Sequence, residues 1–311
     1  MNKFWELMAG KLVERWASLS VGALVFWAGG LVAVAYGSGG VPSFATSVMA
    51  RPVVLQVVAV AGALVLVAAS SLLVRRLSSP VLSLLQGPWH GLGLTKFSSR
   101  MAKRQRDKAN DLTREWRGLA ELLEKQPSAE TQRRYVYLDD RLRRRPDAAE
   151  AADFLPTPIG NVVRAADCRV VQRFGLFPAT VWPRLWLILP EDVKDELRTA
   201  RNSVDACVST AIWGAGFALF GFLDWRAAVA GVVVLVLTIW FWLPSRVAAF
   251  TDLTESVFEL HRFALYEQLR LPVPVHPDEE HVKGTQLTVY LFRGISPRGV
   301  DFTGTTEGTA S

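Results

Sequence analysis

Four long apolar runs without a charged residue constrain this chain more than any other feature of its sequence. Each run has about the 20 residues that a helix needs to cross roughly 30 Å of hydrocarbon. Half of the chain (50%) is hydrophobic, which fits several membrane spans better than an ordinary soluble domain. In chain order, the runs are Leu19–Gly37, Val53–Val74, Ala206–Leu223 and Ala227–Leu243.

The charges between the runs predict two membrane hairpins and their orientation. The loop of the first pair, residues 38–52, contains one charged residue, Arg51. The loop of the second pair comprises only residues 224–226. Residues 75–205, between the pairs, contain 24 Lys or Arg and 17 Asp or Glu, a net of +7 (24 − 17). Because Lys and Arg accumulate on the cytoplasmic side, we expect both termini and the middle segment in the cytoplasm. The predicted location is a bacterial inner (plasma) membrane.

The predicted fold class is an all-α integral membrane protein with four transmembrane helices in two hairpins and a helical cytoplasmic domain. Small residues in the first and third runs allow close helix contacts, and four short spans make a thin bundle, so we expect a homo-oligomer. Ala33-Val34-Ala35 resembles a signal-peptide cleavage site, but the long lead with Glu6 and Glu14 favours a retained span. The predicted parts are an amphipathic N-terminal helix (1–18), hairpin 1 (19–74), a basic cytoplasmic domain (75–205), hairpin 2 (206–243), a C-terminal cytoplasmic helix and short strand (244–293) and a disordered tail (294–311).

Local signals place several elements outside the membrane. Ser128 is a credible N-cap for an arginine-rich helix, and a helix that begins at Glu191 runs directly into the third apolar run. The other expected elements are a long helix at Phe97–Gln126, an amphipathic helix at Arg246–Leu271, and a short strand at Gln286–Arg293, where polar and apolar residues alternate.

The arginine-rich helix after Ser128 is the leading candidate for a binding site. Arg134, Arg141 and Arg145 are seven and four residues apart, so they share one face. Arginine next to tyrosine can pair with phosphate and stack on a base, which suits a nucleotide or oligonucleotide ligand. The same pattern also fits a solvated face, or attraction to anionic lipid. The ligand-binding candidates are Arg133, Arg134, Arg141, Arg144 and Arg145, with Arg164, Arg173 and Arg184 as second candidates.

The N-terminal helix has two interpretations. Its apolar stripe with basic flanks is typical of a helix that lies on the inner leaflet. In the other interpretation the helix is a plug that moves relative to a pore, and its gate residues are Trp5, Leu7 and Leu12.

No catalytic or nucleotide-hydrolysis motif is present, so the sequence indicates neither an enzyme nor a cofactor. An enzyme would need a buried cluster of His261 with Asp or Glu. His276 and His281 bracket acidic residues, but their spacing matches no metal template, so no metal site is predicted. The spans lack ionisable groups, which disfavours ion-coupled carriers. The topology places Cys168 in the cytoplasm and Cys207 in the membrane, so we expect no disulfide between them.

Part of the basic domain resembles a known block. The residues that carry the resemblance are Leu155–Ala166 (LPTPIGNVVRAA), Gln172–Leu176 (QRFGL) and Val181–Leu185 (VWPRL). They are similar to a block in a family of uncharacterised bacterial four-span membrane proteins of the actinomycete type. That family often has Arg where Pro158 stands and Tyr where Phe174 stands. The resemblance implies the two-hairpin plan, and it implies no mechanism.

In layout, the chain is also similar to Hailong-type antiphage membrane effector channels. These are oligomeric membrane proteins whose cytoplasmic part senses an oligonucleotide and whose N-terminal helix closes the pore. The similarity rests on layout alone. It implies a ligand-gated ion channel or pore in antiviral defence, whose partners are the lipid bilayer, copies of itself and an anionic nucleotide or oligonucleotide. The alternative is a non-conducting membrane scaffold or anchor whose basic domain docks a cytoplasmic protein partner or anionic lipid.

Overall fold

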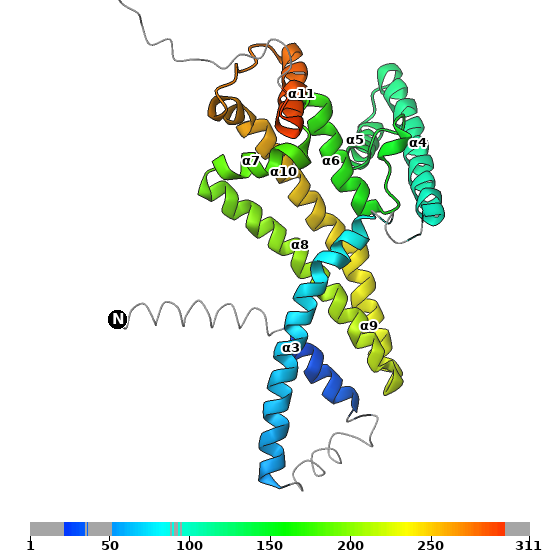
Figure 1. Cartoon of the computed structure of the whole chain (residues 1–311). Coiled ribbons are helices and arrows are strands. Elements are labelled where there is room, and N and C mark those ends of the chain that lie inside the picture. The colour runs from blue at the N-terminus through cyan, green and yellow to red at the C-terminus, as the bar shows by residue number, and fades with distance from the viewer. Residues whose placement is uncertain are drawn as a thin grey trace, which may run out of the picture. The chain divides into compact units, whose positions relative to one another are not determined.

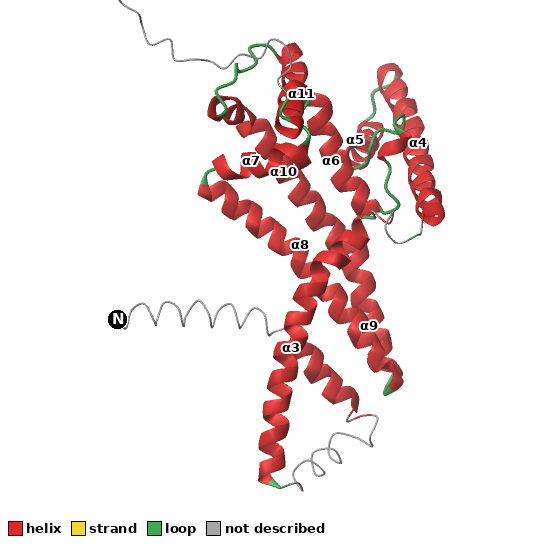
Figure 2. Ribbon diagram, viewed as in Figure 1, coloured by secondary structure: helices red, strands yellow, loops and turns green. Residues whose placement is uncertain are grey.

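A computed structural model describes most of the chain, and the regular elements in the part it describes are all helical (Figures 1 and 2). No strand occurs among these residues, which confirms the all-α part of the predicted fold class. The predicted N-terminal helix with its gate residues, and the tail beyond Ile295, lie outside the described residues. The described residues are 22–34, 36, 52–87, 89, 93 and 95–295.

Contacts divide the chain into two compact units. The first unit contains the described residues of 1–83 and 203–244, and the second contains those of 84–202 and 245–311. The first unit contains the described parts of the four apolar runs, and the second contains most of the basic middle segment.

Among the residues that the structure describes, three helices are long and apolar enough to cross a membrane. The fourth predicted span is described only as the apolar helix Gly22–Val34, which is shorter than the others, so four spans stay a prediction. The three long helices are α3 (Val53–Gln86), the helix Glu191–Phe222 formed by α8 (Glu191–Ala218) and η3 (Leu219–Phe222), and the helix Trp225–Gln268 formed by α9 (Trp225–Leu237), the π-helical turn η4 (Thr238–Trp242) and α10 (Leu243–Gln268).

Helix α3 presents large apolar side chains outward along its first part. Val53 and Val65 are 72% and 69% exposed, for example. A surface of this kind is costly in water and favourable against hydrocarbon, so it supports a lipid-facing position for α3.

Close backbone contact joins α8 and α9 in the second hairpin. Asp224 caps α9, because its carboxylate accepts a hydrogen bond from the Arg226 backbone N–H (3.0 Å). A Cβ atom at Gly231 would lie 2.4 Å from the Ala218 nitrogen and 2.7 Å from the Gly214 oxygen. No side chain fits there without moving a helix, so these glycines set the approach of the two helices.

The second unit begins with two paired helices, α4 (Thr95–Lys125) and α5 (Ala129–Arg143). The Ser128 hydroxyl accepts a hydrogen bond from the Glu130 N–H (3.3 Å), which confirms Ser128 as the N-cap of α5. The unit continues with η2 (Ala151–Asp153), α6 (Pro158–Phe174), α7 (Pro178–Ile188), parts of α8 and α10, and α11 (Pro277–Arg293).

The segment that carries the family resemblance forms a tightly bonded start to α6. Thr157 caps the helix by accepting from the Gly160 N–H (3.0 Å). The buried Asn161 side chain accepts from the Leu155 N–H (2.7 Å) and donates to the Leu155 carbonyl (3.0 Å). Asn161 therefore closes the chain before α6 onto the helix, and Thr157 supplies one of the partners that a helix start lacks. From α6 onward, the unit has a buried core whose largest members include Leu185 of α7, Leu197 of α8 and Phe258 of α10.

The predicted short strand at Gln286–Arg293 is wrong, because this stretch belongs to helix α11. Signals at both helix ends outweigh the alternation: Pro277 stands in the first turn with three acidic residues after it, and Gly294 adopts a left-handed conformation (φ 66°) just past the end. Leu287 is buried and Leu291 packs against the same core four residues later, which is helical spacing.

Candidate functional site

Helix α5, the leading candidate from the sequence, is held against α4 along one side. The Trp116 and Tyr135 rings stack with their centroids 5.3 Å apart, and Leu138 is buried. This packing determines which face of α5 is exposed to solvent. Tyr137 is 58% exposed, and Arg133 and Arg141, each four residues away from it, are exposed as well.

Four of the eight candidate arginines are engaged with carboxylates inside the second unit. A guanidinium in such a pair has to leave or share its partner before it can bind phosphate, so these four are less available to a ligand. The pairs on the surface are worth little by themselves. The four pairs are Arg134 with Glu115 (2.5 Å), Arg144 with Asp140 (3.1 Å), Arg164 with Asp153, and Arg173 with Glu259.

The other four arginines have no carboxylate partner among the residues that the structure describes. Arg184 donates to the backbone oxygens of Thr180 (2.6 Å) and Leu291 (3.4 Å), so it ties α7 to α11. The remaining three, Arg133, Arg141 and Arg145, belong to α5 or follow it directly.

We use the name cationic patch for Arg133, Tyr137, Arg141 and Arg145. The Arg141 guanidinium lies over the Tyr137 ring, 5.7 Å from its centroid, and donates to the Tyr137 hydroxyl (3.3 Å). Partial burial lowers the pKa of Arg145, and the nearby positive charge of Arg141 lowers it further. Two like charges near each other with no described counter-charge make a favourable place for an anion.

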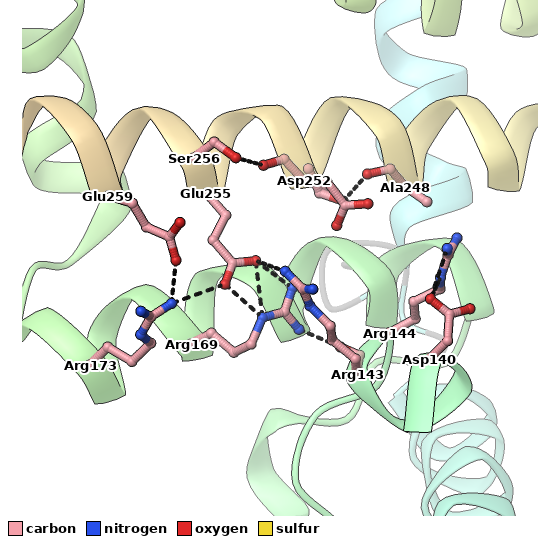
Figure 3. A network of polar contacts seen from close by, with 11 residues as sticks. Asp140, Arg143, Arg144, Arg169, Arg173, Ala248, Asp252, Glu255, Ser256 and Glu259 are labelled. Carbon is pink, nitrogen blue, oxygen red and sulfur yellow. Dashed lines mark hydrogen bonds and ion pairs between the residues drawn. The ribbon is translucent and has the colours of Figure 1, made fainter. Parts of the chain in front are cut away.

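A second cluster of charges, which was not predicted from the sequence, joins α5, α6 and α10 (Figure 3). Glu255 on α10 is only 3% exposed. Its carboxylate pairs with Arg169 of α6 (2.7 Å), Arg143 at the end of α5 (3.5 Å) and Arg173 of α6 (3.9 Å). Arg173 also pairs with Glu259, one turn further along α10. We call these five residues the Glu255 cluster.

A sequence signal for the Glu255 cluster exists in hindsight. Arg169 and Arg173 are four residues apart, as are Glu255 and Glu259, so each pair shares one face of its helix. Two such complementary pairs can meet when the helices pack side by side. The sequence cannot say which of its many charged pairs will do so, because 86 residues separate Arg169 from Glu255.

Cys168 lies in a third polar environment, beside Asp153, Arg164 and Asp167 in a cavity of about 320 Å³. Burial raises the pKa of the Cys168 thiol to about 11, although Arg164 opposes this shift. Burial also raises the pKa of Asp167. Within the described ranges, no group of three or more His, Cys, Asp or Glu is arranged to hold a metal ion.

The raised pKa makes Cys168 a slow nucleophile. In the variant Cys207→Ser, we expect Cys168 to react with a soluble maleimide at pH 8 about a hundredfold more slowly than a model thiol of pKa about 9. The reason is that each additional pKa unit lowers the thiolate fraction roughly tenfold. The measurement is the pseudo-first-order labelling rate, with the denatured chain as the control that regains the model rate. Equal rates for the native chain and the model thiol would contradict the burial of this thiol.

No family model, curated protein or solved structure matches this chain. The resemblances noted in the sequence therefore stay predictions.

Proposed function

We propose that the chain is an oligomeric membrane channel or pore-forming effector, gated through its basic, cytoplasmic, ligand-sensing domain, and that it acts in antiphage defence. The ligand is an anionic nucleotide or oligonucleotide that binds the cationic patch. Trp5, Leu7 and Leu12 form the gate in this proposal. The observation that carries it is the charge of Arg141 and Arg145, for which the structure describes no carboxylate partner, beside the exposed Tyr137 ring.

The chemistry of the cationic patch favours this class of ligand. Guanidinium groups pair with phosphate in a planar, two-pronged geometry, and an aromatic ring supplies a stacking surface for a base. Arg141 itself stacks on Tyr137, so the two side chains already form a flat surface with a positive edge.

The Glu255 cluster offers a route from the patch to a candidate span. Arg143 stands between Arg141 and Arg145 in sequence, and its guanidinium pairs with Glu255. Glu255 belongs to a continuous 44-residue helix, Trp225–Gln268, whose apolar part is a candidate span. A ligand that shifts the end of α5 would alter the Arg143–Glu255 pair and so act on this helix.

The polar groups of the first unit suit a pore with an apolar lining. The Ser71, Thr210 and Thr238 hydroxyls donate to backbone carbonyls of their own helices, at 2.8, 2.9 and 2.7 Å. The Ser78 and Ser209 hydroxyls lie 3.1 Å apart and bond to each other. Because these hydroxyls already have hydrogen-bond partners, a lumen formed between subunits would be mostly apolar. An apolar lumen fits gating by dewetting.

The test compares the double variant Arg141→Gln/Arg145→Gln with a matched control, Arg104→Gln/Arg114→Gln, which removes two exposed charges from α4. The full chain is reconstituted in liposomes, and ion flux is followed with ATP, a cyclic dinucleotide and a short oligoadenylate as probes. We expect one of these probes to open the pore, and the patch variant to need roughly tenfold more of it, because each lost charge-assisted bond costs on the order of 1 kcal/mol. The control stays within about twofold.

Two outcomes would contradict the proposal. If both double variants need the same concentration of probe for ion flux, the cationic patch is not the ligand site. Binding of a probe with no flux at any concentration would favour the non-conducting scaffold instead.

A further inference from the structure

A second group of basic residues lies outside the cationic patch, along a cavity of the second unit. This cavity has a volume of about 640 Å³ and lies along the first half of α4, with residues 151–156 on its other side. We call it the α4 cavity. None of the residues that form the cationic patch lines it.

The two walls of the α4 cavity differ in chemistry. The α4 wall contributes Lys96, Lys103 and Arg106 against one carboxylate, Asp107, a net of two positive charges (3 − 1). The opposite wall, between Ala151 and Pro156, contributes no charged side chain to the lining. A ligand that fits both walls has an anionic end and an apolar body.

The basic side chains of the α4 cavity form no ion pairs with described carboxylates. No ion pair of Lys96, Lys103 or Arg106 is formed among the described residues. Arg106 uses its Nε–H on the Ala148 carbonyl (3.0 Å), which leaves its terminal nitrogens for another partner.

A serine also lines the α4 cavity. Ser98 is only 5% exposed and lines the cavity. Its hydroxyl can donate a hydrogen bond to a ligand in the cavity or accept one from it.

The start of α4 adds to the same field. Helix α4 is 31 residues long and has no acidic residue in its first turn. The backbone N–H groups of a first turn have no helical partners, and the helix dipole places partial positive charge there. Thr95, Lys96 and Ser98 of this turn all line the cavity.

We propose that the α4 cavity binds a phosphate group carried on an apolar body. Phosphate matches a charge of about two, accepts several hydrogen bonds at once, and suits a mixture of ammonium, hydroxyl and helix N-terminal donors. The source of the phosphate is the headgroup of an anionic phospholipid or a soluble phosphate ester. The site is independent of the ligand that the cationic patch is proposed to sense.

The experiment uses the full chain with two probes. Binding of inorganic phosphate is measured by titration calorimetry in a neutral detergent, and binding of phosphatidylglycerol against phosphatidylcholine is measured by native mass spectrometry. The charge variant is Lys96→Gln/Lys103→Gln, and its matched control is Lys108→Gln/Lys125→Gln, which removes two exposed lysines from the same helix. The filling variant is Ala152→Trp, which blocks the cavity without changing charge, and its control is Ala149→Trp outside the lining.

We expect the wild-type chain to bind at least one probe, and both cavity variants to weaken that binding by roughly tenfold or more. Both controls stay within about twofold. Binding of inorganic phosphate assigns the site to a soluble ester, and binding of phosphatidylglycerol alone assigns it to a lipid headgroup. The proposal is overturned if the wild-type chain binds neither probe, or if the control variants lose as much binding as the cavity variants.

Discussion

Replacing Glu255 with glutamine is expected to lower the free energy of unfolding of the full chain by about 3 kcal/mol, as is typical when one partner of a buried ion pair is removed. Glutamine keeps the size of the side chain and removes its charge. Arg143, Arg169 and Arg173 then share a site with Glu259 as the remaining carboxylate of the cluster. The charge of Arg169 is destabilised most by the loss of Glu255, because Arg169 is only 22% exposed and is less able than Arg143 and Arg173 to reach water. The measurement is denaturant unfolding in detergent, followed by far-ultraviolet circular dichroism.

Two further variants separate a buried charge from an ordinary lost contact. Glu279→Gln is the matched control, since Glu279 is half exposed and pairs only locally with Lys283 (3.0 Å); we expect a change below about 0.5 kcal/mol. Glu255→Met combined with Arg169→Met removes both charges and is expected to be less destabilised than Glu255→Gln. If Glu255→Gln costs under about 1 kcal/mol, the cluster is well solvated and does not hold α10 to α6.

The helices that the sequence predicted well are those with strong local signals at their ends. The predicted helix at Phe97–Gln126 is found at Thr95–Lys125, and the helix that begins at Glu191 continues into the third apolar run as expected. Their end signals, such as Ser128 at the start of α5, act over a few residues, so the sequence alone is enough to place them.

The sequence failed where one pattern fits two structures. At Gln286–Arg293, alternation suggested a strand, yet Leu287 and Leu291 are equally compatible with one face of a helix, and packing against the core decided for the helix. The Pro-rich stretch around Pro183 forms helix α7, with Pro178 in its first turn.

The candidate site shows a second limit of sequence reasoning. The sequence placed eight arginines in the basic domain but could not tell the ion-paired ones from those without a counter-charge. Arg164 and Arg133 look alike in the sequence. In the fold, Arg164 lies beside Asp153, whereas Arg133 donates to a backbone carbonyl and has no carboxylate partner among the described residues. Contacts of this kind join residues that are far apart in sequence, and local patterns carry no record of them.

Replacing Gly231 with leucine is expected to disrupt the hairpin of α8 and α9 and to lower the free energy of unfolding by about 3 kcal/mol, at the upper end for overpacking. The first atom of the new side chain would lie 2.4 Å from the Ala218 backbone nitrogen and 2.7 Å from the Gly214 oxygen. Both are backbone atoms, so a rotamer change cannot relieve the clash, and the helices have to separate. Separation loses the close packing that holds helices together in a membrane, where burial of apolar surface adds little.

The matched control for this prediction is Gly62→Leu on α3. A Cβ atom at Gly62 meets nothing within 4 Å, and leucine favours a helix more than glycine does, so we expect the control to stay within about 0.5 kcal/mol of the wild-type chain or to exceed it. Both variants add the same side chain to an apolar helix, so a difference between them reports the contact and not the residue type. The measurement is the unfolding midpoint of the detergent-solubilised chain together with the fraction that elutes as a single species in size-exclusion chromatography. If Gly231→Leu and Gly62→Leu behave alike, α8 and α9 do not touch at Gly231, and the second hairpin is held by its short turn alone.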